Sequence, residues 1–302
     1  MIGDLDPDWP TAATLLVDHP HIGDGRAVVS LLGAHTFSSS VTPRSGRSTP
    51  RAVRAALAKY STWSFEDQVD LLERVVLHDR GDVDDADSEA AMGALRSHFA
   101  DAHSDLWILL GGDNALTWRA LSTMARDELD GWGLVTLDAH LDMREGRSNG
   151  SPVRQLLDEG LPGTNVVQVG LADFSNSSAY ARQAQAHGVT FIARHELRSR
   201  GVAAVCAEAL AVAGGQGRPV YVDIDLDVCD RSVAPACPAA TPGGLSADEV
   251  REFVRVISAS PQVRALDVTE IDVERDAPDE RTVRLAALLV LEALTGYLRR
   301  RP

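Results

Sequence analysis

Three ionisable side chains lie directly behind an apolar run in residues 134–143 (LVTLDAHLDM). They are Asp138, His140 and Asp142, which occupy every second position and therefore point to the same side of an extended chain. Carboxylate oxygens combined with an imidazole nitrogen suit Mn, Fe, Zn or Ni better than Ca or Mg. We therefore expect a metal site here, although for one aspartate alone a solvated turn would be the better interpretation.

A second acidic segment, residues 222–230 (VDIDLDVCD), contains Asp223, Asp225, Asp227 and Asp230. The first three are spaced by two and share one face of a strand, which is costly unless cations neutralise the carboxylates. The intervening residues are apolar, so the opposite face is buried and the acidic face must meet water or metal. A solvent-facing strand is the alternative. The segment does not favour an EF-hand, because the loop glycine and the terminal glutamate are not at the required positions.

Two further segments place polar residues after apolar runs. In residues 111–121 (GGDNALTWRAL), two glycines permit a tight turn before a helix, but the segment matches neither GxxxxGK[ST] nor GxGxxG. In residues 263–272 (VRALDVTEID), Glu270 ends the apolar part and can project into the same cleft. A surface glutamate is the alternative interpretation.

The elements that must position these residues form an alternating pattern. Short apolar runs without alternation predict strands buried on both faces, and segments with helical spacing lie between them. The predicted strands are residues 27–34, 105–112, 132–140, 165–171, 189–193, 219–228 and 263–272; the predicted helices include residues 49–60, 88–102, 246–259 and 280–300. Such alternation indicates a parallel α/β sheet, whose ligands bind at the carboxyl edge.

Local signals mark the ends and connections of these elements. Ser246 and Glu249 form a predicted capping box at the start of a helix. Residues 36–50 are rich in Ser, Thr, Pro and Gly, and residues 78–90 are acidic and polar, so both are predicted loops. Neither is long enough for a linker, and we expect one domain over residues 1–302.

The composition restricts the class of partner. The chain has 302 residues, is 44% hydrophobic and carries a net charge of −15, which favours a packed core and argues against nucleic acid or an anionic membrane as a partner. Three cysteines without repeat spacing do not indicate a disulfide framework. The amino-terminal segment has neither a basic region nor a long apolar stretch, so we expect a cytoplasmic protein with no signal peptide or membrane span.

The order of the motifs resembles that of the ureohydrolase superfamily of arginases, agmatinases, guanidinobutyrases and formimidoylglutamases. The sequence contains GGD, then DAHxD, then DxDxxD with a proline-containing loop and GGL, then DxxE, over about residues 30–290. The resemblance implies a three-layer α/β/α fold with a mostly parallel eight-stranded, arginase-like sheet. It also implies two Mn²⁺ ions, a C–N bond hydrolysed by a metal-bridging hydroxide, and a possible homo-oligomer.

The resemblance assigns a role to each matching residue. Asp138 and Asp225 correspond to bridging carboxylates, His140 to a ligand of one metal, Asp142 to a ligand of the other and Asp227 to a terminal ligand. Asp142 is also the expected proton relay.

Outside this ligand set, Glu270 corresponds to the glutamate that pairs with the amidinium group of the substrate and serves as a catalytic residue. Asp230 matches a family position that is not a ligand, and Asp223 lies outside the register.

The sequence departs from the family pattern at two positions. Asn114 follows GGD where many members have a histidine ligand, so we expect it to bind one metal weakly or through water. Asn149-Gly150 stands where arginases and agmatinases have a His-Gly pair, which leaves the proton shuttle without that histidine.

The segment after DAHxD indicates the substrate. DMRE…SNGSPVRQLL resembles the formimidoylglutamase pattern D-L-R…S-G-T-P-x-R-Q-L. The implied substrate, N-formimidoyl-L-glutamate, is cleaved to glutamate and formamide in histidine degradation. Its two carboxylates suit Arg144 and Arg154 as clamps beside Asn149, with Arg44 and Arg47 as weaker candidates. Surface or helix-cap salt bridges are the alternative for these arginines.

Two other functions stay open. One is an agmatinase, guanidinobutyrase or arginase-like enzyme that releases urea from a guanidino compound. An agmatine site would not need arginines beside the cleft, because that substrate is a dication. The other is a metal-poor, non-catalytic homologue, which Asn114 in place of a histidine would permit.

Overall fold

The structure, a computed structural model, describes residues 6, 8–20, 25–45, 48–100 and 104–300. Over these ranges, nine strands form one parallel sheet in the order β1-β5-β2-β6-β11-β10-β7-β8-β9. Their bounds are β1 (Leu16–Val17), β2 (Ala27–Ala34), β5 (Val75–Asp82), β6 (Leu106–Gly111), β7 (Gly133–Leu137), β8 (Val166–Leu171), β9 (Thr190–Ala193), β10 (Val220–Asp225) and β11 (Val263–Thr269). A separate antiparallel pair is formed by β3 (Trp63–Ser64) and β4 (Val69–Asp70).

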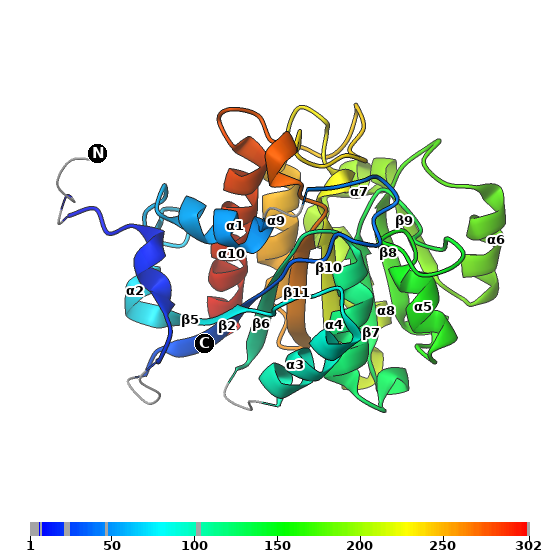
Figure 1. Ribbon diagram of the computed structural model, residues 1–302, viewed down its shortest axis with the longest axis horizontal. Helices are drawn as coiled ribbons and strands as arrows, with labels where there is room; N and C mark the ends of the chain where they lie inside the picture. Colours follow the sequence, from blue (N-terminus) through cyan, green and yellow to red (C-terminus); the bar gives the residue numbers. More distant parts are fainter. Residues whose placement is uncertain (1–5, 7, 21–24, 46–47, 101–103, 301–302) are drawn as a thin grey trace.

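Helices cover both faces of the sheet, which gives three layers (Figure 1). One face is covered by α1 (Thr49–Leu57), α7 (Arg194–Arg200), α8 (Val202–Ala213), α9 (Ala247–Ser258) and α10 (Arg281–Leu298); the other by α3 (Glu89–Phe99), α4 (Ala115–Ala125), α5 (Pro152–Asp158) and α6 (Ser178–Ala186). The short α2 (Leu71–Arg74) precedes β5. The expected three-layer α/β/α fold is confirmed, with nine strands in the described sheet instead of eight. The first of these is the two-residue edge strand β1.

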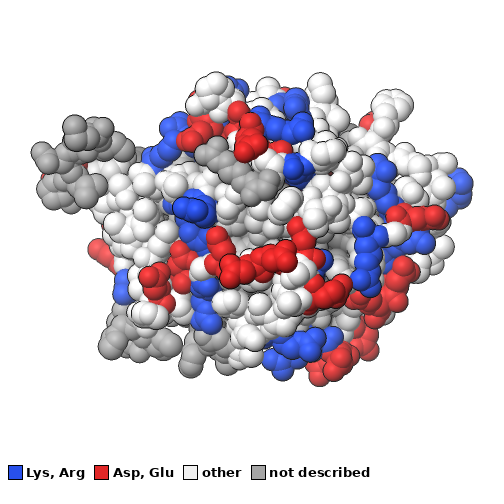
Figure 2. All heavy atoms as spheres, in the orientation of Figure 1, with Lys and Arg blue, Asp and Glu red and all other residues white. Residues whose placement is uncertain are grey.

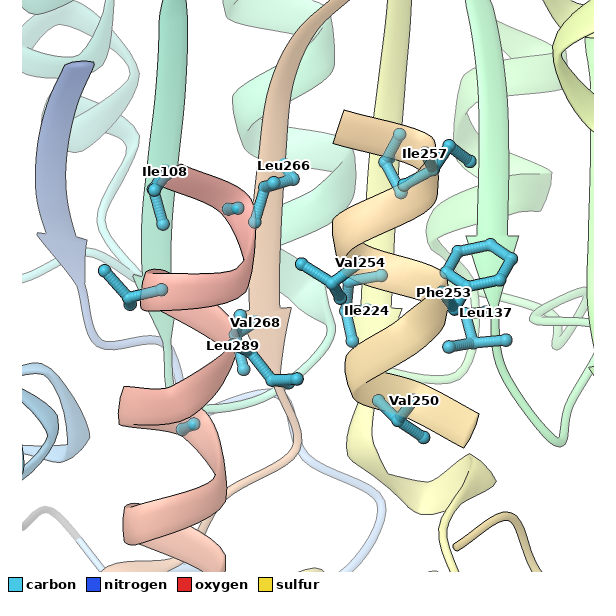
Figure 3. Close-up of a cluster of buried hydrophobic side chains, with 14 of the residues drawn as sticks. Ile108, Leu137, Ile224, Val250, Phe253, Val254, Ile257, Leu266, Val268 and Leu289 are labelled. Carbon is cyan, nitrogen blue, oxygen red and sulfur yellow. The ribbon is translucent and has the colours of Figure 1, made fainter. Parts of the chain in front are cut away.

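Helix α9 illustrates how the sequence produces this packing. Its buried residues Val250, Phe253, Val254 and Ile257 recur at helical spacing and lie over the central strands (Figure 3). The predicted capping box is confirmed: Ser246 Oγ accepts from Glu249 N at 3.2 Å, and Glu249 Oε2 accepts from Ser246 N at 2.7 Å. The apolar stripe and the cap together fix where the helix begins and which side faces the sheet.

The predicted loop over residues 78–90 is wrong in its first part. Strand β5 continues to Asp82, and its polar residues are held by Arg54 of α1. Arg54 donates from Nε to Asp79 Oδ2 at 2.8 Å and from Nη1 to Asp82 Oδ1 at 2.6 Å. Ion pairs with a covering helix therefore allow a polar segment to form a strand beside β2.

The surface carries both signs of charge. On the face in Figure 2, Asp and Glu side chains are interspersed with Lys and Arg, without the continuous basic surface typical of nucleic-acid binding. In the part of the chain that the structure describes, no helix combines the length and hydrophobicity that crossing a membrane requires.

Candidate metal centre and adjoining cavity

Four neighbouring strands, β6, β11, β10 and β7, carry the predicted site residues at their carboxyl ends. Asp138 directly follows β7, Asp225 ends β10 and Glu270 directly follows β11, while Asn114 precedes α4. Parallel strands end at the same edge, so residues far apart in the sequence meet there. Gly112 is required in the turn before Asn114, because a Cβ on it would lie 2.3 Å from the carbonyl oxygen of Thr36.

The five predicted Asp and His ligands form two adjoining groups. Side-chain ligand atoms of Asp138, His140 and Asp227 lie within 4.8 Å of one another, as do those of Asp138, Asp142 and Asp225. Asp138 therefore belongs to both groups, as expected of a bridging carboxylate. Its Oδ2 is buried and has no hydrogen-bond partner among the described residues. An unpartnered buried carboxylate oxygen at the junction is consistent with cation binding.

Backbone and side-chain contacts orient these carboxylates. Asp138 Oδ1 accepts from His140 N at 2.7 Å, and Asp225 Oδ1 accepts from Asp227 N at 2.7 Å. Asp227 Oδ1 accepts from Ala139 N at 3.1 Å, while its Oδ2 lies 2.6 Å from His140 Nδ1. The segments after β7 and β10 thus hold each other's ligands in place.

The electrostatics of the cluster are unfavourable without a cation. Burial, and then the neighbouring carboxylates, raise the pKa of Asp138 and of Asp225 well above the usual range. Burial also raises the pKa of Asp142 to about 7, against the effect of His140. Burial lowers the pKa of His140, but Asp227 outweighs it and raises that pKa to about 9. His140 likewise outweighs burial at Asp227 and lowers its pKa.

Asn114 is buried beside the cluster and turns its amide nitrogen towards it. Its Nδ2 donates to Asp142 Oδ2 at 2.7 Å, whereas its Oδ1 accepts from Thr117 Oγ1 at 2.7 Å and Thr269 Oγ1 at 3.1 Å. In this orientation the side chain holds Asp142, and a direct ligand role would need the amide to turn over. The assignment of Asn114 as a weak or water-mediated ligand stays a prediction.

Two site residues have left-handed backbone conformations that are uncommon outside glycine. The φ angles are 51° at Asp142 and 66° at Glu270. Such conformations cost about 1–2 kcal/mol each for a residue with a Cβ and are found preferentially at functional sites. In both cases the sharp turn directs a carboxylate back towards the strand ends.

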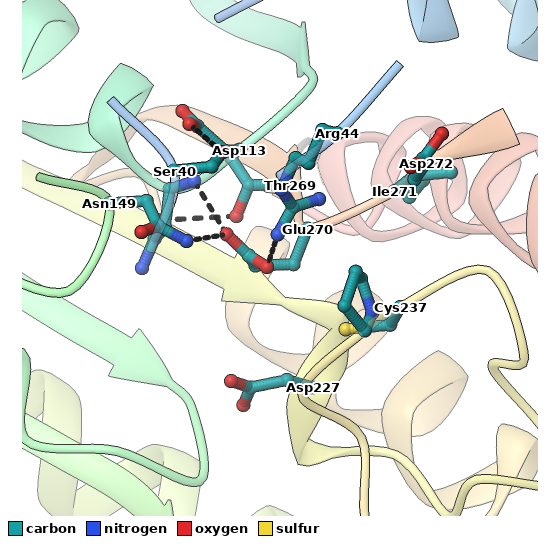
Figure 4. Close-up of polar contacts among 12 residues, drawn as sticks. Ser40, Arg44, Asp113, Asn149, Asp227, Cys237, Thr269, Glu270, Ile271 and Asp272 are labelled. Carbon is teal, nitrogen blue, oxygen red and sulfur yellow. Dashed lines mark hydrogen bonds and ion pairs between the residues drawn. The ribbon is translucent and has the colours of Figure 1, made fainter. Parts of the chain in front are cut away.

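Glu270 is surrounded by donors from three segments (Figure 4). Its Oε1 accepts from the backbone N of Asn114 at 3.0 Å and from Asn149 Nδ2 at 2.9 Å. Its Oε2 pairs with Nη2 of Arg44, which comes from the loop between β2 and α1. Both side chains of this ion pair are buried. The weaker candidate Arg44 is therefore the arginine that reaches the core of the site.

A cavity of about 370 Å³ joins Glu270 to the acidic cluster. It is lined by His140, Asp142, Asp225, Asp227 and Glu270, and also by Arg44, Arg144 and Asn149. Its size is within the range of small-molecule sites.

The other candidate arginines lie elsewhere. Arg154, among the described residues, does not line this cavity, and its Nε lies 3.7 Å from Asp158 Oδ2, one helical turn along α5. Arg47 lies outside the described residues.

The sequence motifs did not predict a buried polar network that lies next to the acidic cluster. Asp267 Oδ2 accepts from Tyr221 Oη at 2.7 Å and from Thr117 Oγ1 at 3.0 Å, and Asp223 Oδ2 lies 3.5 Å from Asn114 Nδ2. The sequence did contain one signal for this network. Asp267 and Thr269 are two residues apart on β11 and therefore lie on the same face of the strand. Cys237 also comes close to Asp225 and Glu270, and nothing in its sequence context indicates that position.

Comparison with known proteins identifies the family. The model of the arginase family matches residues 27–296. A formimidoylglutamase of Bacillus subtilis is 34% identical in an alignment that covers 88% of this chain and 86% of the relative. A proclavaminate amidinohydrolase of Streptomyces clavuligerus is 31% identical in an alignment that covers 73% of this chain and 72% of that protein.

Solved structures agree in fold. The Bacillus subtilis formimidoylglutamase has a TM-score of 0.86 at 30% identity and covers 98% of this chain and 95% of its own. A Trypanosoma cruzi formiminoglutamase with Mn²⁺ has a TM-score of 0.84 at 24% identity, with 97% and 100% covered, and bears on the fold alone. The protein belongs to the arginase family, because the family model matches most of the chain and a relative is 34% identical over most of both chains.

Proposed function

We propose that this chain hydrolyses the formimino C–N bond of N-formimidoyl-L-glutamate, giving glutamate and formamide, in a Mn²⁺-dependent reaction. Formimidoylglutamases that are 34% and 32% identical are among its relatives. The observation that carries the proposal is the cavity, which joins an acidic cluster and Glu270 to two arginines, Arg44 and Arg144. A substrate with an amidinium group and two carboxylates matches that combination of charges.

The donor set fits a pair of divalent metals. They would be held by Asp138, His140, Asp142, Asp225 and Asp227, whose oxygen and nitrogen donors suit Mn²⁺. Cations held there lower the pKa of water and stabilise developing negative charge. We propose Mn²⁺ because the resemblance to the arginase family implies this ion.

The protein's own residues would orient the substrate and move protons. Glu270, held by Asn114 and Asn149, would pair with the amidinium and fix the formimino carbon over the acidic cluster. Asp142, which lines the cavity and is oriented by Asn114 Nδ2, would carry a proton to the leaving amine. Arg144, exposed at the cavity, would bind a carboxylate of the substrate.

A guanidino substrate is the second candidate, because one relative is named proclavaminate amidinohydrolase. The test is a panel of both substrate types, assayed on the purified protein with and without added Mn²⁺. We expect Mn²⁺-dependent release of formamide from N-formimidoyl-L-glutamate and no urea from agmatine or 4-guanidinobutyrate. Urea release without formamide would replace the proposal by the guanidino reaction. Neither product in excess Mn²⁺ would favour a non-catalytic protein.

A further inference from the structure

The loop between β2 and α1 is anchored around Arg44. Ser45 Oγ donates to Asp272 Oδ1 at 2.6 Å, and Val41 N donates to Asn149 Oδ1 at 2.8 Å. Arg275 Nη2 donates to the carbonyl oxygen of Pro43 at 3.1 Å. These contacts on both sides hold the backbone of Arg44, so its side chain is directed into the cavity.

Arg44 retains hydrogen-bonding capacity inside the cavity. Its side chain is only 2% exposed, and one nitrogen, Nη2, pairs with Glu270. Among the described residues, no acceptor contacts its Nε or Nη1, and both are buried. Buried guanidinium donors without acceptors are costly, so this position favours a ligand that brings a carboxylate.

The charge around the cavity strengthens this requirement. Apart from Arg44 and Arg144, no Lys or Arg of the described chain lines it, whereas Asp142, Asp225 and Asp227 do. With the proposed Mn²⁺ ions neutralising these aspartates, Arg44 and Arg144 are the described basic side chains that can meet the carboxylates of an anionic substrate. A guanidinium substrate without carboxylates, such as agmatine, would bring only positive charge to Arg44 and would be repelled by it.

We propose that Arg44 determines the charge specificity of the enzyme by binding the α-carboxylate of the substrate while it remains paired with Glu270. The α-carboxylate is two bonds from the formimino nitrogen, so an amidinium at Glu270 brings it towards the guanidinium of Arg44. Arg144, exposed at the cavity, then serves the distal carboxylate. This inference rests on the proposed function and adds to it the residue that distinguishes acidic from basic substrates.

The test compares Arg44→Gln with the wild type on two substrates, N-formimidoyl-L-glutamate and N-formimidoyl-4-aminobutyrate, which lacks only the α-carboxylate. We expect kcat/KM for the first to fall about 10- to 100-fold, chiefly through KM, because a charge-assisted contact is lost. For the second, the loss is at least about tenfold smaller, because only the pairing of Arg44 with Glu270 is removed and no α-carboxylate contact is lost. Arg44→Lys recovers part of the loss, and Arg51→Gln, an exposed arginine on α1, changes neither value.

Equal losses on both substrates would mean that Arg44 only supports Glu270, and would overturn the proposal. Should the wild type release no formamide, the proposed function fails, and binding of L-glutamate decides the role of Arg44 by itself. Calorimetry in Mn²⁺ should then give about tenfold weaker glutamate binding to Arg44→Gln than to the wild type. Equal affinities, or no binding to the wild type, would count against Arg44.

Discussion

Replacing Asn114 by histidine tests how this chain holds its metals. The side-chain amide is buried and lies 2.7 Å from Asp142 Oδ2, so an imidazole at this position would reach the same ligand group. We expect Asn114→His to bind the weaker Mn²⁺ at least about tenfold more tightly, since even residues that only orient a ligand change metal affinity by about 10- to 100-fold.

The metal-free variant should be less stable than the wild type. The amide of Asn114 contacts Thr117 and Thr269 through Oδ1, and Asp142 and Asp223 through Nδ2. An imidazole has two nitrogens and can keep two of these four contacts. Losing two hydrogen bonds at about 0.5–1.5 kcal/mol each lowers the free energy of unfolding by about 1–3 kcal/mol.

Metal content after dialysis and titration calorimetry with Mn²⁺ measure the affinity, and denaturant unfolding with and without Mn²⁺ measures the stability. Asn165→His is the matched control, because Asn165 is also buried but lies before β8, at the opposite end of the sheet. It should leave metal affinity unchanged. The reasoning is refuted if Asn114→His binds Mn²⁺ no more tightly than the wild type, because another group or a water would then already fill that position.

Three further outcomes follow from the same contacts. Asp225→Asn should lose bound metal and lower formamide release by at least about 100-fold, whereas Asp230→Asn, which changes an aspartate outside the cluster, should retain both. Chelation of the metal should lower the Tm. Mn²⁺ at about 100 times its Kd should raise the free energy of unfolding by about 2.7 kcal/mol, and a Tm that does not depend on metal would contradict this. Hydrogen bonds from Ser232 and Gly243 lower the pKa of Asp230 to about 2, below its value of about 3.9 in the unfolded chain. The difference in the free energy of unfolding between wild type and Asp230→Asn should therefore hold above about pH 4 and shrink towards about pH 2. Denaturant unfolding across that range measures it, and a constant difference would show that the hydrogen bonds at Asp230 do not stabilise the folded state.

Central strands were predictable because burial on both faces leaves an unmistakable apolar run. The run at residues 27–34 has the same bounds as β2, and the other six predicted strands match observed ones to within a few residues. Strand β5 was missed because its second half is polar, and its ion pairs with Arg54 come from a helix that precedes it in the sequence. Pairing of this kind is a tertiary contact that local periodicity does not encode.

The site was predictable to the extent that topology alone brings strand ends together. Asp138, His140, Asp142, Asp225 and Asp227 meet because β7 and β10 are neighbours. Their spacing marked them in advance together with Asp223, and the register of the family motif set Asp223 apart. The sequence could not show in the same way which of the candidate arginines line the cavity. Arg44 and Arg154 both lie outside strands, and their directions depend on the anchors of a loop and on the turn of a helix.

Asn114 contacts both the acidic cluster and Glu270, through different atoms. Its side chain contacts Asp142 in the acidic cluster, but its backbone N–H donates to Glu270 at 3.0 Å. Substitution at position 114 therefore alters the ligand side while leaving the donor to Glu270 in place, since every residue except proline has that N–H. We therefore expect that a chain in this family can exchange a histidine for an amide at this position, bind one metal more weakly and still hold the carboxylate proposed to orient the substrate. The same reasoning separates the two effects in Asn114→His, where metal affinity should change and the KM measured at saturating Mn²⁺ should not.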